Sequence, residues 1–282
     1  MSVLAVSGLE KTFAGFKAVD NVDLELERGE MLGLIGANGA GKSTLLHLIY
    51  GRLQPDRGSI RFNGTDVTLL PVTDRARMGM GLVFQIISVF DGLTVDENLL
   101  LGALRKGSVS PPRERSELFP PPANGVSVGG GGAEGDGGGG EYPEGGRGAR
   151  PDMLDREALE KVIDLVDLRA VRARSAGKLG HGEKQRLEIG MVLLTRPTLL
   201  LLDEPTSGMT EAESRHTAGL LQTLRSEGAI EGAIVVEHNI EFIRLVADRV
   251  TVMHRGAVLA DGPIDQVQDD PAVQASFLGR LH

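Results

Sequence analysis

The sequence lacks cysteine and tryptophan, and only 4% of its 282 residues are aromatic. Without thiols, the chain can form neither a disulfide framework nor a thiolate site. No apolar run approaches the ~20 residues that a membrane-spanning helix needs. The N-terminal MSVLAVSGLEKTF has no basic segment before a long apolar core, so we expect no signal peptide. The formal net charge of −9 argues against a generally basic surface that would bind nucleic acid.

Hydrophobic residues make up 41% of the chain, which is enough for a large core. A helix is expected from Lys42 to a glycine stop at Gly51, and a helical pattern starts near Val95. Apolar or alternating segments predict strands at 3–7, 22–27, 31–35, 58–62, 81–84, 198–205 and 232–238, and a hairpin over 250–262. Strands that alternate with helices indicate an α/β fold with a mostly parallel sheet.

Glycine is concentrated in one segment, residues 108–151, where nine of the twelve residues from 129 to 140 are glycine. Such a segment cannot bury enough apolar surface to offset the entropy of ordering it, so we expect a disordered insertion. The insertion lies within a helical part, 91–175, between two halves of an α/β core, 1–90 and 176–282. We interpret the whole chain as one domain.

The stretch GANGAGKST at 36–44 fits the phosphate-loop pattern G-x-x-x-x-G-K-[ST], between an apolar strand and a predicted helix. Its glycines allow the backbone N–H groups to wrap a phosphate. Lys42 would reach the β- and γ-phosphates of ATP, and the Ser43 hydroxyl would ligate Mg²⁺. The predicted nucleotide-binding residues of this loop are Gly36, Asn38, Gly39, Ala40, Gly41, Lys42, Ser43 and Thr44.

The second chemical element is TLLLLDEP, a buried strand that ends in two carboxylates. Asp203 would hold the Mg²⁺, and Glu204 would orient and deprotonate the water that attacks the γ-phosphate. An acidic pair after a strand also occurs as a plain helix-start signal. Together with the phosphate loop, the pair indicates a P-loop NTPase that uses ATP and Mg²⁺.

The order of the phosphate loop, Gln85, LGHGEKQ, TLLLLDEP, SGMT and His238 resembles the ABC ATPases over nearly the whole chain, except the glycine-rich insertion. The resemblance implies a P-loop NTPase core with a mostly parallel sheet, a small antiparallel β part and a helical subdomain. It also implies an ATP hydrolase that works as a pair of ATP-binding subunits.

Three further site residues come from this resemblance. Phe13 stands where the family has an aromatic ring that stacks on adenine. Gln85 corresponds to the glutamine that touches Mg²⁺ and the attacking water and senses the membrane partner. His238 corresponds to the histidine that bonds the γ-phosphate. Each also has a plainer interpretation, as a core phenylalanine, a surface glutamine or a core histidine.

The segment KLGHGEKQRLEIG at 178–190 places glycines before a charged, amphipathic helix, where free N–H groups favour an anion. Taken alone, it is equally a turn with a helix start. The resemblance identifies Leu179–Glu183 with the family's signature motif, which binds the ATP held by a second subunit. The corresponding nucleotide-binding residues are Gly180, His181, Gly182 and Glu183. Gly180 replaces the family's serine, and Thr210 replaces the usual aspartate at the end of the loop Ser207–Thr210.

Within the family, HGEKQRLEIGM, SGMT and VVEHNIEFIRLVADRVTVMHRGAVLADG are similar to the ATPases for branched-chain amino-acid uptake. HGEKQ-LEIGM, GMT and a C-terminal motif at Phe277–Arg280 are most similar to the urea-transport branch. This implies a peripheral subunit at the cytoplasmic face of the inner membrane. Its partners would be a second ATPase subunit, two permeases and, indirectly, an external solute-binding protein.

Two other functions remain open at this point. One is a non-transport ABC ATPase that acts on DNA or a ribosome. The single nucleotide-binding module and the acidic charge balance argue against it, and no nucleic-acid partner is expected. The other is a regulatory module that binds ATP but hydrolyses it slowly. Gly180 is its only support, since Lys42, Asp203 and Glu204 are present.

Overall fold

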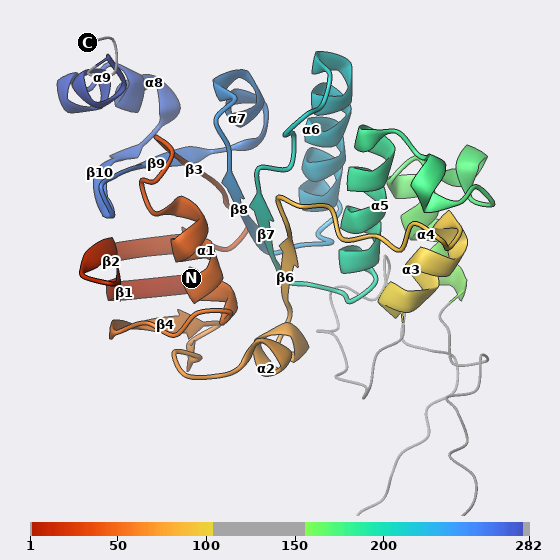
Figure 1. Ribbon diagram of the computed structural model, residues 1–282, viewed down its shortest axis with the longest axis horizontal. Helices are drawn as coiled ribbons and strands as arrows, with labels where there is room; N and C mark the ends of the chain where they lie inside the picture. The colour runs from red at the N-terminus through yellow and green to blue at the C-terminus, as the bar shows by residue number, and fades with distance from the viewer. Residues whose placement is uncertain (1, 104–155, 279–282) are drawn as a thin grey trace, which may run out of the picture.

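The computed structural model describes residues 2–103 and 156–278. The predicted glycine-rich insertion at 108–151 lies outside the described residues, as does the end of the predicted motif at 277–280. The described chain contains two β-sheets with helices packed around them (Figure 1). The predicted α/β fold, with a mostly parallel sheet, a small antiparallel sheet and a helical part, is confirmed.

The larger sheet has six strands in the order β10-β9-β3-β8-β7-β6. All neighbours in it are parallel except β10, which pairs antiparallel with β9 as the predicted hairpin. The strands are β3 (Met31–Gly36), β6 (Met80–Val83), β7 (Leu199–Asp203), β8 (Gly232–Val236), β9 (Arg249–His254) and β10 (Ala257–Gly262).

The smaller sheet is antiparallel, in the order β2-β1-β4-β5. Its strands are β1 (Ser2–Phe13), β2 (Phe16–Glu27), β4 (Arg57–Phe62) and β5 (Thr65–Asp66). The first two strands are longer than the predicted 3–7 and 22–27. A two-residue turn at Ala14 and Gly15, both with positive φ, lets the strands pair up to Phe13 and Phe16. The charged and polar residues that hid this extension from the hydrophobic pattern lie on exposed or partly exposed positions of the hairpin.

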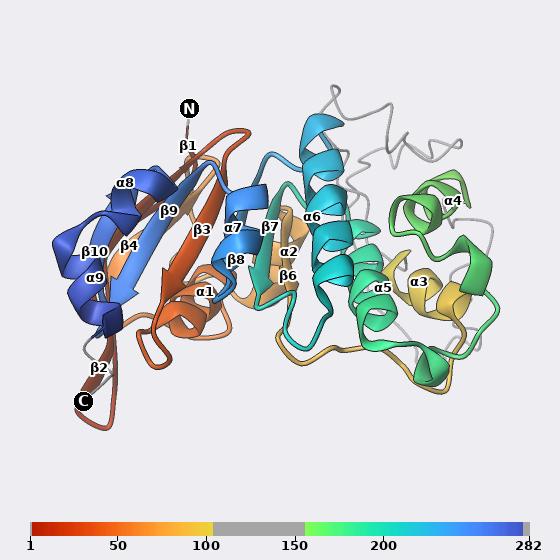
Figure 2. The same cartoon turned by 90° about the horizontal axis from the view of Figure 1, so that it is seen from above.

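The helices gather on two sides of the larger sheet. α3, α4 and α5 contact one another beyond its β6 end, in both views (Figures 1 and 2). None of the described helices is long and apolar enough to cross a membrane. The helices are α1 (Lys42–Tyr50), α2 (Val72–Arg77), α3 (Val95–Ala103), α4 (Arg156–Leu165), α5 (His181–Leu193), α6 (Glu211–Ser226), α7 (Ile240–Val246), α8 (Ile264–Gln268) and α9 (Pro271–Leu278).

The larger sheet separates two hydrophobic cores. Alternate residues of a strand point to opposite faces, and β7 shows this directly. Leu199 and Leu201 pack with α1 and the antiparallel sheet, whereas Leu200 and Leu202 pack with α5 and α6. Both faces are therefore covered, which explains why the strands read as continuous apolar runs.

One arginine is fully buried in the first of these cores. Arg75 of α2 has no exposed surface, and burial lowers its pKa to about 10. Its guanidinium donates hydrogen bonds to the backbone carbonyls of Leu48, Ile49, Thr68 and Leu70. Two of these carbonyls belong to the last turn of α1, and that of Leu48 also accepts the Gly51 N–H at 3.1 Å. Arg75 thus supplies charged donors to the end of the helix that follows the phosphate loop.

We expect Arg75→Met to destabilise the fold by about 3 kcal/mol, because buried carbonyls would lose their charged donor. Arg77→Met is the matched control, since Arg77 lies two positions further along the same helix in an exposed pair with Asp74, and should cost under about 0.5 kcal/mol. Chemical denaturation of both variants measures the difference. Equal unfolding midpoints would show that Arg75 is not needed to hold the end of α1.

Candidate functional site

The ends of four neighbouring strands form the candidate nucleotide site. β3, β8, β7 and β6 are parallel neighbours, so their carboxyl ends meet at one edge of the sheet, where α/β proteins place their ligands. β3 leads into the phosphate loop, β7 ends at Asp203, and Gln85 and His238 follow β6 and β8. A cavity of about 370 Å³ opens there. Its lining is Asn38, Gly39, Ala40, Gly41, Lys42, Ser43, Thr44, Gln85, Glu204 and His238.

The phosphate loop needs glycine at two positions because the chain passes close to other backbone. A Cβ on Gly36 would lie 2.2 Å from the Met253 carbonyl oxygen, and one on Gly41 would lie 2.2 Å from the Ala18 carbonyl oxygen. Both glycines also have positive φ. The Lys42 ammonium donates to the carbonyls of Gly36, at 2.8 Å, and of Ala37, at 3.1 Å. The loop therefore holds its lysine inside the predicted phosphate cradle.

Asp203 and Ser43 come together from opposite ends of the sequence. The Ser43 hydroxyl, at the start of α1, donates to the Asp203 carboxylate at 3.1 Å. Burial raises the pKa of Asp203, and the Ser43 hydrogen bond partly opposes that shift. No group of three or more His, Cys, Asp or Glu side chains suited to a metal occurs among the described residues. A hydroxyl beside one carboxylate does fit Mg²⁺, which uses one or two protein carboxylates together with substrate phosphates.

The Glu204 carboxylate is the centre of the site. Its Oε2 accepts a hydrogen bond from the Gln85 side-chain amide at 2.7 Å, and its Oε1 lies 2.6 Å from His238 Nε2. The residue has φ of +49°, a conformation that non-glycine residues adopt rarely and often at functional sites. The structure thus brings together the three residues predicted to be catalytic, although their roles remain predictions.

Glu237 supports this centre and was missed at the level of sequence. It is buried, and one carboxylate oxygen accepts from both the N–H and the hydroxyl of Thr206, at 2.8 and 2.6 Å. The other oxygen accepts from the His238 N–H at 3.0 Å. Glu237 therefore ties the loop after Glu204 to the loop that carries His238. The signal in the sequence was an acidic residue directly after the apolar strand, in VVEH.

The signature-like residues lie elsewhere, at the N-terminus of α5. Gly180 precedes the helix and gives its N–H to the Glu183 carboxylate at 2.8 Å. His181 Nε2 lies 2.6 Å from the Ser207 carbonyl oxygen, which ties the motif to the loop Ser207–Thr210. None of Gly180, His181, Gly182 and Glu183 is among the described residues that line the phosphate-loop cavity. One chain therefore presents two separate sites.

The predicted amphipathic character of α5 needs a correction. The segment is helical as expected, but its buried residues include the polar Gln185 and Glu188 as well as apolar side chains. The cause is that α5 packs between α6 on one side and α3 and α4 on the other, and so leaves little of its surface to solvent (Figure 2).

Phe13 lies outside the cavity lining, at the tip of the β1–β2 hairpin, where it is 41% exposed. Its ring is covered by the Lys11 ammonium, 5.6 Å from the ring centroid. The same hairpin approaches the phosphate loop through the Ala18 carbonyl next to Gly41. Phe13 is thus not a core phenylalanine, and stacking on adenine stays a prediction.

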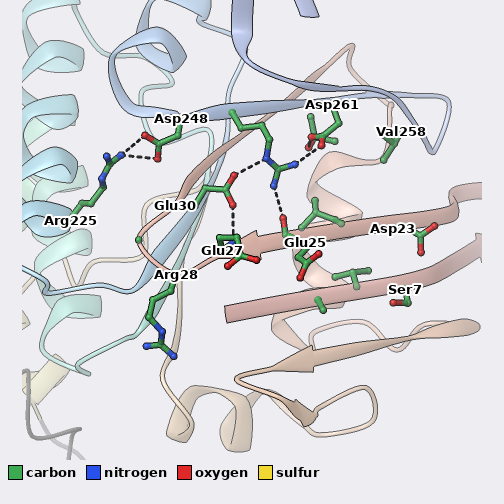
Figure 3. A pocket seen from close by; sticks show the side chains of 16 residues that line it. Ser7, Asp23, Glu25, Glu27, Arg28, Glu30, Arg225, Asp248, Val258 and Asp261 are labelled. Atoms are coloured by element: carbon green, nitrogen blue, oxygen red, sulfur yellow. Dashed lines mark hydrogen bonds and ion pairs between the residues drawn. The ribbon is translucent and has the colours of Figure 1, made fainter. Parts of the chain in front are cut away.

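A larger groove of about 940 Å³ lies away from this site, between the antiparallel sheet and the strands β9 and β10 (Figure 3). Arg249 crosses it, with ion pairs to Glu30 at 2.7 Å and Asp261 at 2.5 Å. Arg225 pairs with Asp248 through both carboxylate oxygens. Arg249 also donates to the Glu25 carbonyl of β2 at 2.6 Å, which connects the two sheets, so the groove has a structural explanation.

Comparisons with known proteins agree with this geometry. The family model described as "ABC transporter" matches residues 19–207. The chain is 33% identical over 280 residues to the high-affinity branched-chain amino acid transport ATP-binding protein BraF of Pseudomonas aeruginosa, covering 98% of each. It is 31% identical over 277 residues to the protein of the same description, LivG, of Escherichia coli K12, again covering 98% of each.

Solved structures support the same assignment. The ADP conformation of an ATP-binding cassette of an ABC transporter is similar, with a TM-score of 0.76 and 26% identity, covering 99% of this chain and 100% of that one. The relatives and the solved structure match along nearly the full length, and the family model matches residues 19–207. The chain belongs to the ABC transporter family as an ATP-binding subunit, and ATP hydrolysis is its expected activity.

Proposed function

We propose that this chain binds and hydrolyses ATP to power an importer for branched-chain amino acids. The observation that carries the proposal is the similarity to BraF and LivG over 98% of the chain, combined with a strand-end cavity lined by the phosphate loop, Gln85, Glu204 and His238. The alternative of a DNA- or ribosome-acting ATPase has no comparable support. The alternative of a slow regulatory ATPase depends on Gly180 alone and is tested below.

In the proposed mechanism, the phosphate loop holds the β- and γ-phosphates with its N–H groups and Lys42. Glu204 takes a proton from the attacking water, and its hydrogen bonds to Gln85 and His238 set the direction of the carboxylate. Both neighbours also carry side-chain donors that suit negatively charged phosphate oxygens. Catalysis is then mainly positioning and electrostatic stabilisation, as phosphoryl transfer requires.

Ser43 and Asp203 are the residues that would hold Mg²⁺. Their oxygens are 3.1 Å apart, Ser43 lines the cavity, and the Asp203 side chain is almost fully buried. A metal ion bound there would neutralise negative charge on the phosphates. The protein's part is to fix the two oxygen ligands from α1 and β7 before the nucleotide arrives.

The proposed partner at the phosphates is the signature motif of a second ATP-binding subunit. The separation of the α5 N-terminus from the phosphate-loop cavity supports this, because one chain cannot bring both to the same phosphate. Helix N-termini attract phosphate through their free N–H groups and dipole. ATP would therefore join two subunits, and its hydrolysis would release them.

The proposed membrane partners are two permease subunits, which would place the chain at the cytoplasmic face of the inner membrane. The segment after Gln85 supports this, because Ile86 and Phe90 are 83% and 55% exposed although both are large apolar residues. Exposed apolar side chains near each other are typical of interaction sites. An external solute-binding protein would act through the permeases.

A transport assay distinguishes branched-chain amino acids from urea as the transported solute. With the chain, its permeases and its solute-binding protein reconstituted in proteoliposomes, we expect ATP-dependent uptake of leucine, isoleucine or valine. The sequence motifs LEIGM at 187–191 and GMT at 208–210 favour urea as the second candidate solute. Uptake of labelled urea without uptake of leucine would replace the first proposal, and binding to ribosomes or DNA without uptake would overturn both.

We expect Glu204→Gln to lower the rate of ATP hydrolysis by at least about a hundredfold, because the amide cannot take the proton of the attacking water. The amide has the same shape as the carboxylate, so the variant should still bind Mg-ATP. Without hydrolysis, Mg-ATP should trap a dimer that size-exclusion chromatography with light scattering detects. Glu211→Gln, a change of an exposed residue on α6, is the control. Hydrolysis by the Glu204 variant at the parent rate would place the base elsewhere.

Gly180→Ser should restore a hydroxyl donor to the signature motif. The position accepts a side chain, since φ is −65° and the nearest atom to an added Cβ is a Glu183 oxygen at 3.7 Å. A hydrogen bond to a charged group contributes roughly 1.5–3 kcal/mol, so ATP-dependent dimerisation should strengthen by about ten- to a hundredfold.

The same variant should raise ATPase activity and leave nucleotide affinity of the monomer unchanged, because the motif acts across the dimer. Gly180→Ala is the control that adds the Cβ without the hydroxyl. Unchanged activity and dimerisation would show that the hydroxyl is not limiting, and a change in monomer affinity would contradict the placement in trans.

A further inference from the structure

A buried glutamate on α5 has no part in the mechanism above. Glu188 is only 3% exposed, between the fully buried Leu187 and Ile189. Burial raises its pKa to about 7, against the effect of two backbone hydrogen bonds. Carboxyl groups are rarely buried without a full set of partners, because desolvation of the charged form is costly.

The hydrogen-bond partner of Glu188 is a backbone group close to Gln85. Its Oε1 accepts the N–H of Ser88 at 3.2 Å. The Phe84 backbone also lowers the pKa of Glu188, to a smaller extent than Ser88. Gln85 lies between Phe84 and Ser88 in sequence, and its side chain reaches the Glu204 carboxylate at 2.7 Å. One carboxyl group on α5 thus holds the segment that carries Gln85 through Ser88.

We propose that Glu188 is a positioning residue that holds Gln85 against Glu204 by tying the segment Phe84–Ser88 to helix α5. The inference rests on the proposed role of Gln85 in ATP hydrolysis. Because α5 begins at the signature-like residues, the same helix that would meet the ATP of the second subunit also sets the position of Gln85 in its own chain. Glu188 is then a direct mechanical link between the two sites.

Stability does not explain a carboxyl at this position. Its other oxygen, Oε2, has no hydrogen-bond partner within residues 2–103 and 156–278, and neither has the Gln185 amide nitrogen one turn earlier on the same helix. An apolar side chain of similar volume would avoid this desolvation cost. Glu188 is costly to bury, and its hydrogen bond goes to Ser88. We therefore assign its role to positioning the segment that carries Gln85.

The unbonded atoms Glu188 Oε2 and Gln185 Nε2 give the connection between α5 and the Gln85 segment a second property. When the segment 84–88 shifts relative to α5, Glu188 Oε2 and Gln185 Nε2 are available to bond backbone groups in the new position. A joint of apolar side chains would have no such alternative. The link can thus be kept through a change of arrangement rather than broken by it.

The test is a double-mutant cycle in the full chain with Mg-ATP, using Gln85→Ala, Glu188→Leu and both together. We expect Glu188→Leu to lower kcat about thirtyfold with KM within about twofold, and Glu188→Gln to recover most of kcat because its oxygen still accepts the Ser88 N–H. The double variant should be no slower than Gln85→Ala. Ile189→Ala, on the neighbouring buried position, controls for lost packing and should leave kcat unchanged well below its melting temperature.

If the double variant loses kcat by the product of the two single losses, the inference is overturned, since Glu188 would then act independently of Gln85. If Gln85→Ala hydrolyses ATP at the parent rate, the proposed role of Gln85 fails, and the inference with it. Amide hydrogen exchange of the peptide covering 84–90 measures how firmly this segment is held, and it does not depend on ATP hydrolysis. It should be faster in Glu188→Leu than in Glu188→Gln and Ile189→Ala, and equal rates in the three variants would overturn the inference even if the parent chain hydrolyses no ATP.

Discussion

Two hydrogen bonds to the Glu204 carboxylate hold the candidate site together, because they connect three strands that are far apart in the sequence. Glu204 follows β7, and its partners Gln85 and His238 follow β6 and β8. The backbone reinforces the junction, since the Glu204 N–H donates to the Val236 carbonyl at 2.9 Å. A residue at φ +49° persists only where such surroundings determine it. The strained conformation and the bonding of the carboxylate are therefore parts of one arrangement.

The two hydrophobic cores separate the helices that would make the two proposed nucleotide contacts. α1, which begins at the phosphate loop, packs on one face of the six-stranded sheet, whereas α5 and α6 pack on the other. The sheet between them is buried on both faces and has little freedom to deform. This separation supports the proposal that the N-terminus of α5 acts on ATP held by a second subunit.

Sequence alone predicted the parts of the structure that local chemistry determines. Four leucines before Asp203 predict a buried strand, and the glycines of residues 36–44 predict a phosphate loop between a strand and a helix. The extensions of β1 and β2 were not predictable, because their pairing depends on a turn whose residues, Ala14 and Gly15, give a weak signal. The ion pairs of Arg249 and the carbonyl contacts of Arg75 were hidden for a similar reason, since their partners are brought close only by folding.

Two buried glutamates, Glu237 and Glu188, differ in how completely their carboxylates are hydrogen-bonded. Glu237 was hidden because its meaning depends on Thr206, thirty-one positions earlier. Its carboxylate is fully bonded, so it stabilises the loops that it joins. Glu188 has one bonded and one unbonded oxygen, so its burial carries a desolvation cost that an apolar residue would avoid. A complete set of partners fits a fixed connection such as the one beside His238. An incomplete set fits the proposed connection, which would hold Gln85 in more than one position as the proposed subunits close and separate.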